Sequence, residues 1–299
     1  MAEKSGKNEE GKKRILGKDG MNISPKSLAV SALRYLPLLS ALACSIFAFL
    51  WLLSPTNGSL VGIGWHGSCY DSLAKSLLQG RADVDPDLIG IEAFSVNGHT
   101  FMYFGLFPAL LRLPFVVSGS ELVGHLSPLS CFTASVLSIA AFSALCIPHA
   151  RRNPIMAAWL LLGFTLGTPL FFLGMSASIY HEAIMWALAG ALWSVTSLLY
   201  LFSSGRRKIP WLALCSIAAA VALLARVTFG FPAYLCVAAG FCASVREGGR
   251  KKIVGACLAV LPAIGAVLVQ MWYNYIRFDS VFIVALYKPE DRKSTRLNS

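Results

Sequence analysis

Residues 35–53 read YLPLLSALACSIFAFLWLL, a run that contains no Asp, Glu, Lys or Arg. A helix of about 20 such apolar residues crosses the hydrocarbon core of a bilayer. The whole chain shares this bias, because 56% of its 299 residues are hydrophobic and only 14% are charged, against about 45–50% and about 25% in soluble domains. This composition excludes a disordered protein and nearly any soluble enzyme, and it predicts a polytopic membrane protein.

The same scan for uncharged runs finds further stretches that are long enough to cross a bilayer. We therefore predict an all-α polytopic membrane protein of about seven transmembrane helices. The predicted spans are Tyr35–Leu53, Leu122–Ala150, Ile155–Tyr180, Ala183–Gly205, Ile209–Ala225, Val227–Val245 and Ile253–Ile276. The apolar stretch Thr100–Leu111 would be only about 18 Å long as a helix, so we predict an interfacial or re-entrant helix there.

Four clusters of basic residues indicate how these spans are oriented. They are the Lys and Arg residues of the N-terminal segment 4–34 and the groups Arg151–Arg152, Arg206–Lys208 and Arg246–Lys252. With seven spans, all four clusters fall on one side, which the positive-inside rule makes cytoplasmic. We therefore expect a multi-pass protein of the cell (inner) membrane with a cytoplasmic N-terminus. The net charge of +11 is then a topological signal and no pointer to nucleic acid.

Polar segments flank the membrane domain. Residues 1–30 are rich in Lys, Glu and Gly, and we expect them to form a disordered basic tail. Residues 31–290 form the multi-spanning domain, whose large first outer loop covers residues 54–121. Residues 291–299 match, codon for codon, the translation of a common sequencing-adapter read. We expect this tail to be an artefact and the remainder to be the front part of a longer protein.

The outer loop contains the pattern CYDSLAKSLL at residues 69–78, which has helical spacing. Its apolar positions fall along one face and are Tyr70, Leu73, Ala74 and Leu77. Asp71 and Lys75 lie together on another face at the i, i+4 spacing. Gly80 is expected to end this helix.

Acidic residues and a hairpin motif follow in the same loop. The acids Asp83, Asp85 and Asp87 form a spaced cluster that is either a solvated loop or a set of ligands for a divalent cation. The dipeptide Asn97-Gly98 favours a tight turn between two strands. A helix over Leu106–Phe115 is then expected at the membrane interface, where an aromatic-rich amphipathic stretch is favoured.

The order of a cytoplasmic N-terminus, one span and a large outer loop resembles the GT-C superfamily of membrane glycosyltransferases. The likeness is to the protein-O-mannosyltransferase-like and lipid-sugar-dependent branch found in bacteria. It is carried by the segments Tyr70–Gly80, Asn97–Leu111, Ala225–Pro232 and Tyr273–Ser280. The chain departs from the family at Ser72, because members often carry a second acid directly after the one that matches Asp71.

This resemblance implies that a sugar passes from a polyprenyl-phosphate donor to an acceptor glycan, lipid or protein on the outer face of the membrane, by inverting attack. Such a reaction needs a carboxylate to deprotonate the acceptor hydroxyl and cations to hold the phosphate leaving group. Membrane lipid is an implied partner and nucleic acid is not. No cofactor is certain, although a divalent cation is possible.

The first candidate for the base is Asp71, which matches the position of the family's essential acid. Its structural alternative is an exposed helix charge paired with Lys75. The alternate acids are Asp83, Asp85, Asp87 and Glu92.

Several cationic and polar residues are candidates for binding the donor phosphate. They are Arg112, Arg226, His99, His181 and Glu182. The arginines could instead extend to the membrane surface, and Glu182 could simply stabilise the first turn of its helix. His99 and His66 could be ordinary exposed residues. Asn274 and Arg277 lie beside Trp272, Tyr273 and Tyr275, and we expect them to anchor the membrane interface.

Two other classes of protein stay open, a transporter or lipid flippase and a non-catalytic membrane assembly protein. Transporters place ionisable groups near the middle of the membrane and use broken helices in matched halves. Here the predicted spans are almost free of ionisable groups, and the acids lie in the outer loop. Cys69 alone of the eight cysteines lies in that loop, where an impermeant maleimide should label it unless it is buried.

Overall fold

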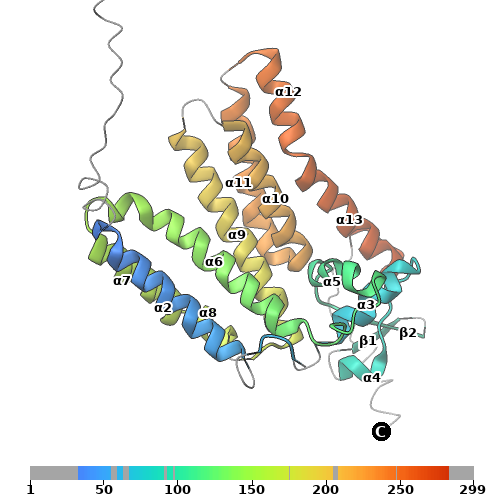
Figure 1. Cartoon of the computed structure of the whole chain (residues 1–299). Coiled ribbons are helices and arrows are strands. Elements are labelled where there is room, and N and C mark those ends of the chain that lie inside the picture. The colour runs from blue at the N-terminus through green and yellow to red at the C-terminus, as the bar shows by residue number, and fades with distance from the viewer. Residues whose placement is uncertain are drawn as a thin grey trace, which may run out of the picture.

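The computed structural model describes residues 33–54, 59–62, 67–90, 93–96, 98–174, 176–204, 208–246 and 248–282. It is a bundle of long helices with a group of short elements at one end (Figure 1). The helices are α2 (Leu36–Leu53), α3 (Cys69–Leu78), α4 (Pro86–Ile89), α5 (Phe107–Val117), α6 (Ser127–Ala150), α7 (Pro154–Leu166), α8 (Pro169–Leu173), α9 (Ile179–Ser203), α10 (Lys208–Ala225), α11 (Val227–Val245), α12 (Arg250–Ala259) and α13 (Leu261–Phe278). The strands β1 (Ala93–Val96) and β2 (His99–Met102) form one hairpin.

Six helices within the described residues are long and apolar enough to cross a membrane. They are α2, α6, α9, α10, α11 and the stretch Arg250–Phe278, which comprises α12 and α13. Helix α11 has the bounds that the sequence predicts, since Arg226 and Arg246 flank its apolar run. The six long apolar helices confirm the prediction of a polytopic helical membrane protein.

The third predicted span, Ile155–Tyr180, is broken. Helix α7 ends after 13 residues, and the separate five-residue helix α8 begins at Pro169. Proline has no N–H to donate, and it disfavours helical dihedrals at the residue before it, Thr168. The Thr168 hydroxyl stabilises the break, because it donates to the Phe164 carbonyl and accepts from the Leu170 N–H. The prediction of a single spanning helix here is therefore wrong.

Small residues and hydroxyl groups bring the long helices together. The hydroxyls of Ser45 and Thr165 lie 2.8 Å apart between α2 and α7, and both residues are buried. Gly190 of α9 lies so close to α10 that an added Cβ would collide with the backbone of Ala218 and Ala222. Close approach at glycine and hydrogen bonds between helices are typical of packing in membranes.

The long helices alternate in direction, so their ends form two groups (Figure 1). Helices α6, α9 and α11 end, and α7, α10 and α12 begin, at the end of the bundle where α2 starts. Arg151, Arg152 and Arg246 directly follow helices that end there. The short elements α3, α4 and α5 and the hairpin lie at the opposite end.

The elements from α3 to α5, which we call the loop segment, share a hydrophobic core with the bundle. Tyr70 and Leu73 of α3 are fully buried in this core. Ile179 and Ala183 of α9 and Tyr273 of α13 belong to the same core. The apolar face that the helical spacing predicts for α3 is thus confirmed, and it packs against protein.

The strands on either side of the turn predicted at Asn97-Gly98 pair as expected, and Asn97 itself lies outside the described residues. Val96 of β1 pairs with His99 of β2, which leaves two residues for the connection. Gly98 has a φ of 79°, a conformation that favours glycine and is typical of tight hairpin turns.

The helix predicted over Thr100–Leu111 begins later in the structure. Residues 100–102 belong to β2, so α5 starts only at Phe107. Pro108 in the first turn favours this start, because an N–H at that position has no partner within the helix. The prediction of a helix from Thr100 is therefore wrong, whereas the helix expected over Leu106–Phe115 is confirmed.

Candidate functional site

Asp71 is buried within the loop segment. It is 4% exposed, whereas Lys75, one turn further along α3, is exposed. Its Oδ1 has no hydrogen-bond partner among the described residues. Burial raises the pKa of Asp71, and the positive charge of Arg112 and the backbone N–H of Gly124 oppose that rise. Asp71 is therefore not an exposed helix charge paired with Lys75, which was the alternative that the sequence left open.

Arg112 of α5 and Glu182 of α9 form a buried ion pair. Nη1 of Arg112 lies 2.6 Å from Oε1 of Glu182, and Nη2 donates to Oε2 at 2.9 Å. Arg112 is 1% exposed and Glu182 is fully buried. Two-point contact of this kind is the strong geometry for a guanidinium and a carboxylate. Glu182 thus occupies the guanidinium that we expected to clamp a phosphate or to extend to the membrane surface.

Polar groups from α6 and α9 complete this pair. The Ser130 hydroxyl donates to Oε1 of Glu182 at 2.5 Å and accepts from the indole N–H of Trp186 at 2.8 Å. Nη2 of Arg112 also donates to the Ser127 hydroxyl at 3.3 Å. A buried ion pair needs such additional hydrogen bonds to offset the cost of removing both charges from water.

Tyr70 links the ion pair to α3. Its hydroxyl donates to the Ile179 carbonyl at 3.1 Å, and its ring centroid lies 5.7 Å from the guanidinium carbon of Arg112. Burial raises the pKa of Tyr70 well above its usual value, and the charge of Glu182 adds to the rise. Asp71 follows Tyr70 in the same helix, and the positive charge of Arg112 acts on it. We call Asp71, Arg112 and Glu182 the buried charge cluster.

A cavity of about 170 Å³ lies between residues 103–105, which precede α5, the first turn of α9, the end of α10, the start of α11 and the last turns of α13. Its polar lining comprises Tyr103, Arg226, Thr228, Gln270, Asn274 and Arg277. Among the described residues, no acidic side chain lines it. We call it the cationic pocket, because a cleft with charge of one sign attracts ligands of the opposite charge.

Arg277 is held firmly in the cationic pocket. Its Nη1 donates to the Met102 carbonyl at 3.0 Å, its Nε to the Tyr273 carbonyl at 3.1 Å and its Nη2 to Oδ1 of Asn274 at 2.9 Å. Its guanidinium carbon also lies 3.7 Å from the ring centroid of Tyr273. These contacts bury Arg277 and tie α13 to β2. Arg277 therefore packs within the protein, and our expectation of an interfacial anchor is wrong.

Arg226 is less restrained than Arg277. It lies between α10 and α11 and is half-buried. Its Nη2 lies 3.4 Å from the Tyr180 hydroxyl, and its guanidinium carbon lies 4.8 Å from the centroid of the same ring. This long hydrogen bond leaves most of the five N–H donors of Arg226 able to bind a ligand.

Gly105 brings the loop segment against the end of α10. An added Cβ at this position would collide with the carbonyl oxygens of Ala225 and Leu224. Ala225 directly precedes Arg226, so the close approach at Gly105 forms one wall of the cationic pocket. A glycine is needed here because no side chain fits between the two backbones.

The first turn of α9 connects the two sites. Glu182 belongs to the buried charge cluster, and the next residue, Ala183, lines the cationic pocket. Consecutive residues of a helix point about 100° apart, so the two sites occupy adjacent faces of one turn. Asp71 is not among the residues that line the pocket. The structure thus places two neighbouring sites at this end of the bundle.

The acidic cluster of the loop segment lies at the surface. Asp83 is 2.5 Å from Nη1 of Arg81 and 3.7 Å from Nδ1 of His99. Asp85 caps the start of α4, where its side chain accepts from the backbone N–H of Asp87, and both of these acids are exposed. The acids therefore belong to a solvated loop, in which Asp85 also caps a helix.

Of the remaining predicted residues, His181 is described and is a member of neither site. Nδ1 of His181 is 2.9 Å from the Ser176 carbonyl oxygen, and His181 is half-buried. Glu92 and His66 fall outside the described residues. Within the described part of the chain, no three His, Cys, Asp or Glu side chains lie where they could hold a metal ion.

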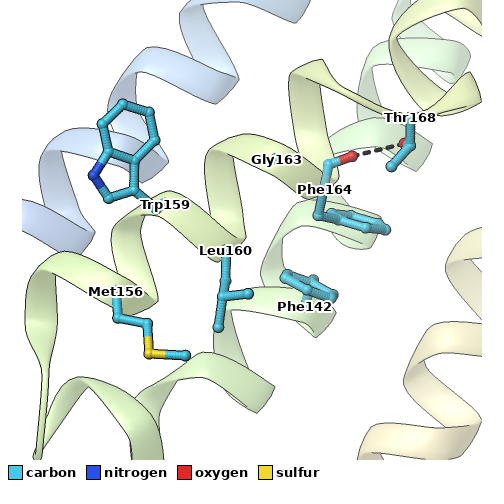
Figure 2. A pocket seen from close by; sticks show the side chains of 7 residues that line it. All are labelled: Phe142, Met156, Trp159, Leu160, Gly163, Phe164 and Thr168. Atoms are coloured by element: carbon cyan, nitrogen blue, oxygen red, sulfur yellow. Dashed lines mark hydrogen bonds between the residues drawn. The ribbon is translucent and has the colours of Figure 1, made fainter.

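A larger groove of about 470 Å³ lies on α6 and α7. Figure 2 shows its side chains, in which the rings of Phe142 and Phe164 stack with centroids 4.1 Å apart. Met156 and Trp159 are exposed beside them. Its lining carries no ionisable side chain, so the groove offers a surface for hydrocarbon and no group for acid–base chemistry.

The polar face of α13 is a feature that we did not predict from the sequence. Gln270, Asn274 and Arg277 follow the i, i+4, i+7 spacing of one helix face. Nε2 of Gln270 donates to Oδ1 of Asn274 at 3.0 Å, whereas its Oε1 is buried without a partner among the described residues. The spacing is visible in the sequence, but the neighbouring aromatic residues favoured an interfacial belt.

The fold and these sites define a multi-pass helical membrane protein with charged sites at one end. Four charged side chains are buried in the described part of the chain, namely Asp71, Arg112, Glu182 and Arg277. All four belong to the buried charge cluster or the cationic pocket. Comparison with the models of known protein families, with curated proteins and with solved structures finds no match.

Proposed function

We propose that the chain is a glycosyltransferase, or the N-terminal part of one, that moves a sugar from a polyprenyl-phosphate donor to an acceptor at the outer face of the membrane. One observation carries this proposal: the buried charges of the described chain gather in two sites that share the first turn of α9. Charges within membrane proteins are costly and usually serve function.

The proposed orientation follows from the two ends of the bundle. Basic residues such as Arg151 and Arg246 flank the end where α2 starts, and the positive-inside rule makes that end cytoplasmic. The two sites then face the outside of the cell (inner) membrane. In this proposal α7 and α8 together make the third of seven crossings, as a broken helix.

The cationic pocket is proposed to hold the phosphate of the donor lipid. Arg277 is fixed by its backbone contacts, and Arg226 has N–H donors without partners among the described residues. Guanidinium groups bind phosphate oxygens through paired, charge-assisted hydrogen bonds. Here they would stabilise the negative charge that develops on the phosphate as the sugar leaves.

Asp71 is proposed to be the general base. An acceptor hydroxyl attacks the anomeric carbon, the bond from that carbon to the phosphate oxygen breaks, and the hydroxyl proton passes to a carboxylate oxygen of Asp71. Its buried Oδ1 would accept the proton, because this atom has no partner among the described residues. The sugar would extend from the cationic pocket past the first turn of α9 to reach Asp71.

A transporter or lipid flippase is the second candidate function. The break between α7 and α8 favours it, since broken helices form the binding sites of many transporters. The groove beside this break carries no ionisable side chain, however. None of the four buried charged side chains lines it. A non-catalytic assembly role leaves the unpartnered oxygen of Asp71 without a purpose.

The proposal is tested by measuring transfer of labelled sugar in membranes that contain the full chain. Polyprenyl-phosphate hexoses and pentoses serve as donors, and membrane extract supplies the acceptor. Wild-type protein should transfer label, and Arg226→Ala should lower transfer by about tenfold or more, because a phosphate contact is lost. Arg81→Ala is the matched control, since Arg81 is an exposed arginine of the loop segment.

The outcomes of this assay are distinct. Equal loss in Arg226→Ala and Arg81→Ala would show that the cationic pocket has no particular role. Transfer from none of these donors by wild-type membranes would overturn the proposed function.

A further inference from the structure

The groove on α6 and α7 is built on an exposed stripe of α7. The members of this stripe follow the i, i+3, i+4, i+7 spacing of one helix face and are Met156, Trp159, Leu160 and Gly163. All four are exposed, although three of them are large and apolar. In a protein that spans a membrane, a face of this kind meets lipid.

The stripe is hollowed at its middle. An added Cβ at Gly163 would find nothing within 4 Å, so the surface is open there. Beside it, Phe142 of α6 stacks on Phe164 with ring centroids 4.1 Å apart (Figure 2). The result is a groove of about 470 Å³ whose lining is almost wholly hydrocarbon.

The groove has the length of a lipid chain in one leaflet. It follows α7 from Met156 in the first turn to Phe164 in the last turn. Eight residues of helix rise about 12 Å. One leaflet contributes about 15 Å of the hydrocarbon core. The groove therefore fits an acyl chain that enters from one surface of the membrane.

Two arginines lie in the turn at the Met156 end of the groove. Arg151 and Arg152 connect α6 to α7. The turn is tied to the groove, because Oδ1 of Asn153 accepts from the backbone N–H of Met156 at 3.0 Å. Arg152 directly precedes Asn153, so the cationic turn adjoins the first residue of the groove.

The charge of this turn is not balanced by the protein. Arg151 and Arg152 are both exposed, and neither forms an ion pair with any described residue. The sequence contains no Asp or Glu between Glu121 and Glu182. Guanidinium groups bind phosphate oxygens through charge-assisted hydrogen bonds. A negative headgroup at the turn and a hydrocarbon chain in the groove would complement both features together.

We propose that the groove and the Arg151–Arg152 turn bind one anionic phospholipid, with its phosphate at the arginines and one acyl chain in the groove. The positive-inside rule places this lipid in the cytoplasmic leaflet, where anionic headgroups attract basic residues. The basic N-terminal segment is no substitute, because the arginines would repel it. The inference goes beyond the proposed function and does not rest on it.

The headgroup contact is tested by lipid retention. The purified, delipidated full chain is incubated with equal amounts of phosphatidylglycerol and phosphatidylcholine that carry the same acyl chains, and native mass spectrometry reads the bound lipid. Wild type should retain phosphatidylglycerol about tenfold or more over phosphatidylcholine, because two arginines act on the charged headgroup. The double variant Arg151→Gln/Arg152→Gln should lose this preference. The control Arg246→Gln/Arg250→Gln removes two exposed arginines at the same end of the bundle and should keep it.

The groove is tested separately by filling it. Gly163→Phe places a large side chain in the open part of the groove, and it should fold because phenylalanine is a better helix former than glycine. It should retain about tenfold less phosphatidylglycerol than wild type. Leu235→Phe, at an exposed position of α11, is the control and should retain as much as wild type.

Three outcomes would overturn the inference. Wild type could retain the two lipids equally, both arginine variants could lose the preference equally, or Gly163→Phe could bind as wild type does. A second copy of the chain in the spectrum, lost in Gly163→Phe, would instead identify the groove as a contact between copies and would also overturn it.

Fluorescence quenching locates the acyl chain. Phosphatidylglycerol with brominated acyl chains should quench tryptophan fluorescence of wild type more than brominated phosphatidylcholine does. This excess should disappear in Trp159→Phe and persist in Trp51→Phe, which removes an exposed tryptophan near the other end of α2. The opposite pattern would place the lipid away from the groove and contradict the inference.

Discussion

Arg112 and Glu182 are 70 residues apart in the sequence and meet in a buried, two-point ion pair, with N···O distances of 2.6 and 2.9 Å. The pair joins the loop segment to the bundle at the first turn of α9. On one face of that turn Glu182 belongs to the buried charge cluster, and on the next face Ala183 lines the cationic pocket. The geometry of both sites therefore depends on how this turn is held.

Breaking the ion pair should destabilise the protein. Arg112→Met or Glu182→Gln alone leaves a buried group without its partner, and we expect a loss of about 3–5 kcal/mol in unfolding free energy. The combined Arg112→Met/Glu182→Met variant should lose less than either single variant, because no buried charge is then left alone. Thermal unfolding in detergent measures these differences.

The matched control for that series is the exposed pair of Arg81 and Asp83. Its removal should change stability by about 0–1 kcal/mol, as is usual at a surface. A double variant at Arg112 and Glu182 that loses the sum of the two single losses would contradict the account.

Cys69 should resist an impermeant maleimide in the folded protein. Its side chain is fully buried and its thiol donates to the Leu88 carbonyl at 3.0 Å. Burial, with the charges of Asp85 and Asp71, raises its pKa to about 12. Since thiolate is the reactive form, about one thiol in ten thousand is reactive at pH 8.

The labelling control is Lys75→Cys, which places a thiol at an exposed position of the same helix. It should react readily when reagent is added outside, and Cys69 should react only after denaturation. Rapid labelling of Cys69 in the native protein would show that α3 is not packed as described.

The charge of Asp71 should cost stability at neutral pH. Burial raises its folded-state pKa above the usual value, so the folded state binds a proton more tightly than the unfolded state does. Stability contributed by this group is therefore lost as pH rises from the unfolded pKa through the folded pKa. Asp71→Asn removes this dependence and should be at least as stable as wild type at pH 7. Denaturant titrations of wild type and Asp71→Asn at several pH values measure the stability difference between them. A wild-type protein that gains stability relative to Asp71→Asn as pH rises above about 4 would refute the expected sign.

The close approach at Gly105 should not tolerate a side chain. Gly105→Ala places a Cβ against the carbonyl oxygens of Ala225 and Leu224, so we expect a loss of about 1–3 kcal/mol and weaker donor binding. Gly163→Ala is the control, because nothing lies within 4 Å of the added carbon. Equal unfolding temperatures for the two variants would argue against this wall of the pocket.

The long helices could be predicted well because uncharged runs and flanking arginines define them locally. α11 spans the predicted residues, and the turn that contains Gly98 follows from two adjacent residues. The break at Thr168 was visible only as one Gly-Thr-Pro sequence inside an apolar run, and the apolar run outweighed it. Sequence patterns thus predicted the elements that depend on neighbouring residues alone, such as an uncharged apolar run or an Asn-Gly turn.

The candidate site was harder to predict, because it depends on contacts between distant segments. Arg112 and Glu182 were both recognised as candidates, but nothing in the sequence shows that they pair across 70 residues. Arg277 was assigned to the membrane interface because aromatic residues surround it. Its burial depends on the Met102 carbonyl of β2, which no pattern in α13 reveals.

In the proposed reaction, Asp71 accepts the proton of the acceptor hydroxyl. The most direct measurement is sugar transfer from a polyprenyl-phosphate donor by Asp71→Asn, at equal protein level, beside Asp87→Asn as an exposed acid of the same segment. We expect a loss of about a hundredfold or more in Asp71→Asn, since a general base contributes at least that much, and no loss in the control. Undiminished transfer by Asp71→Asn would contradict it.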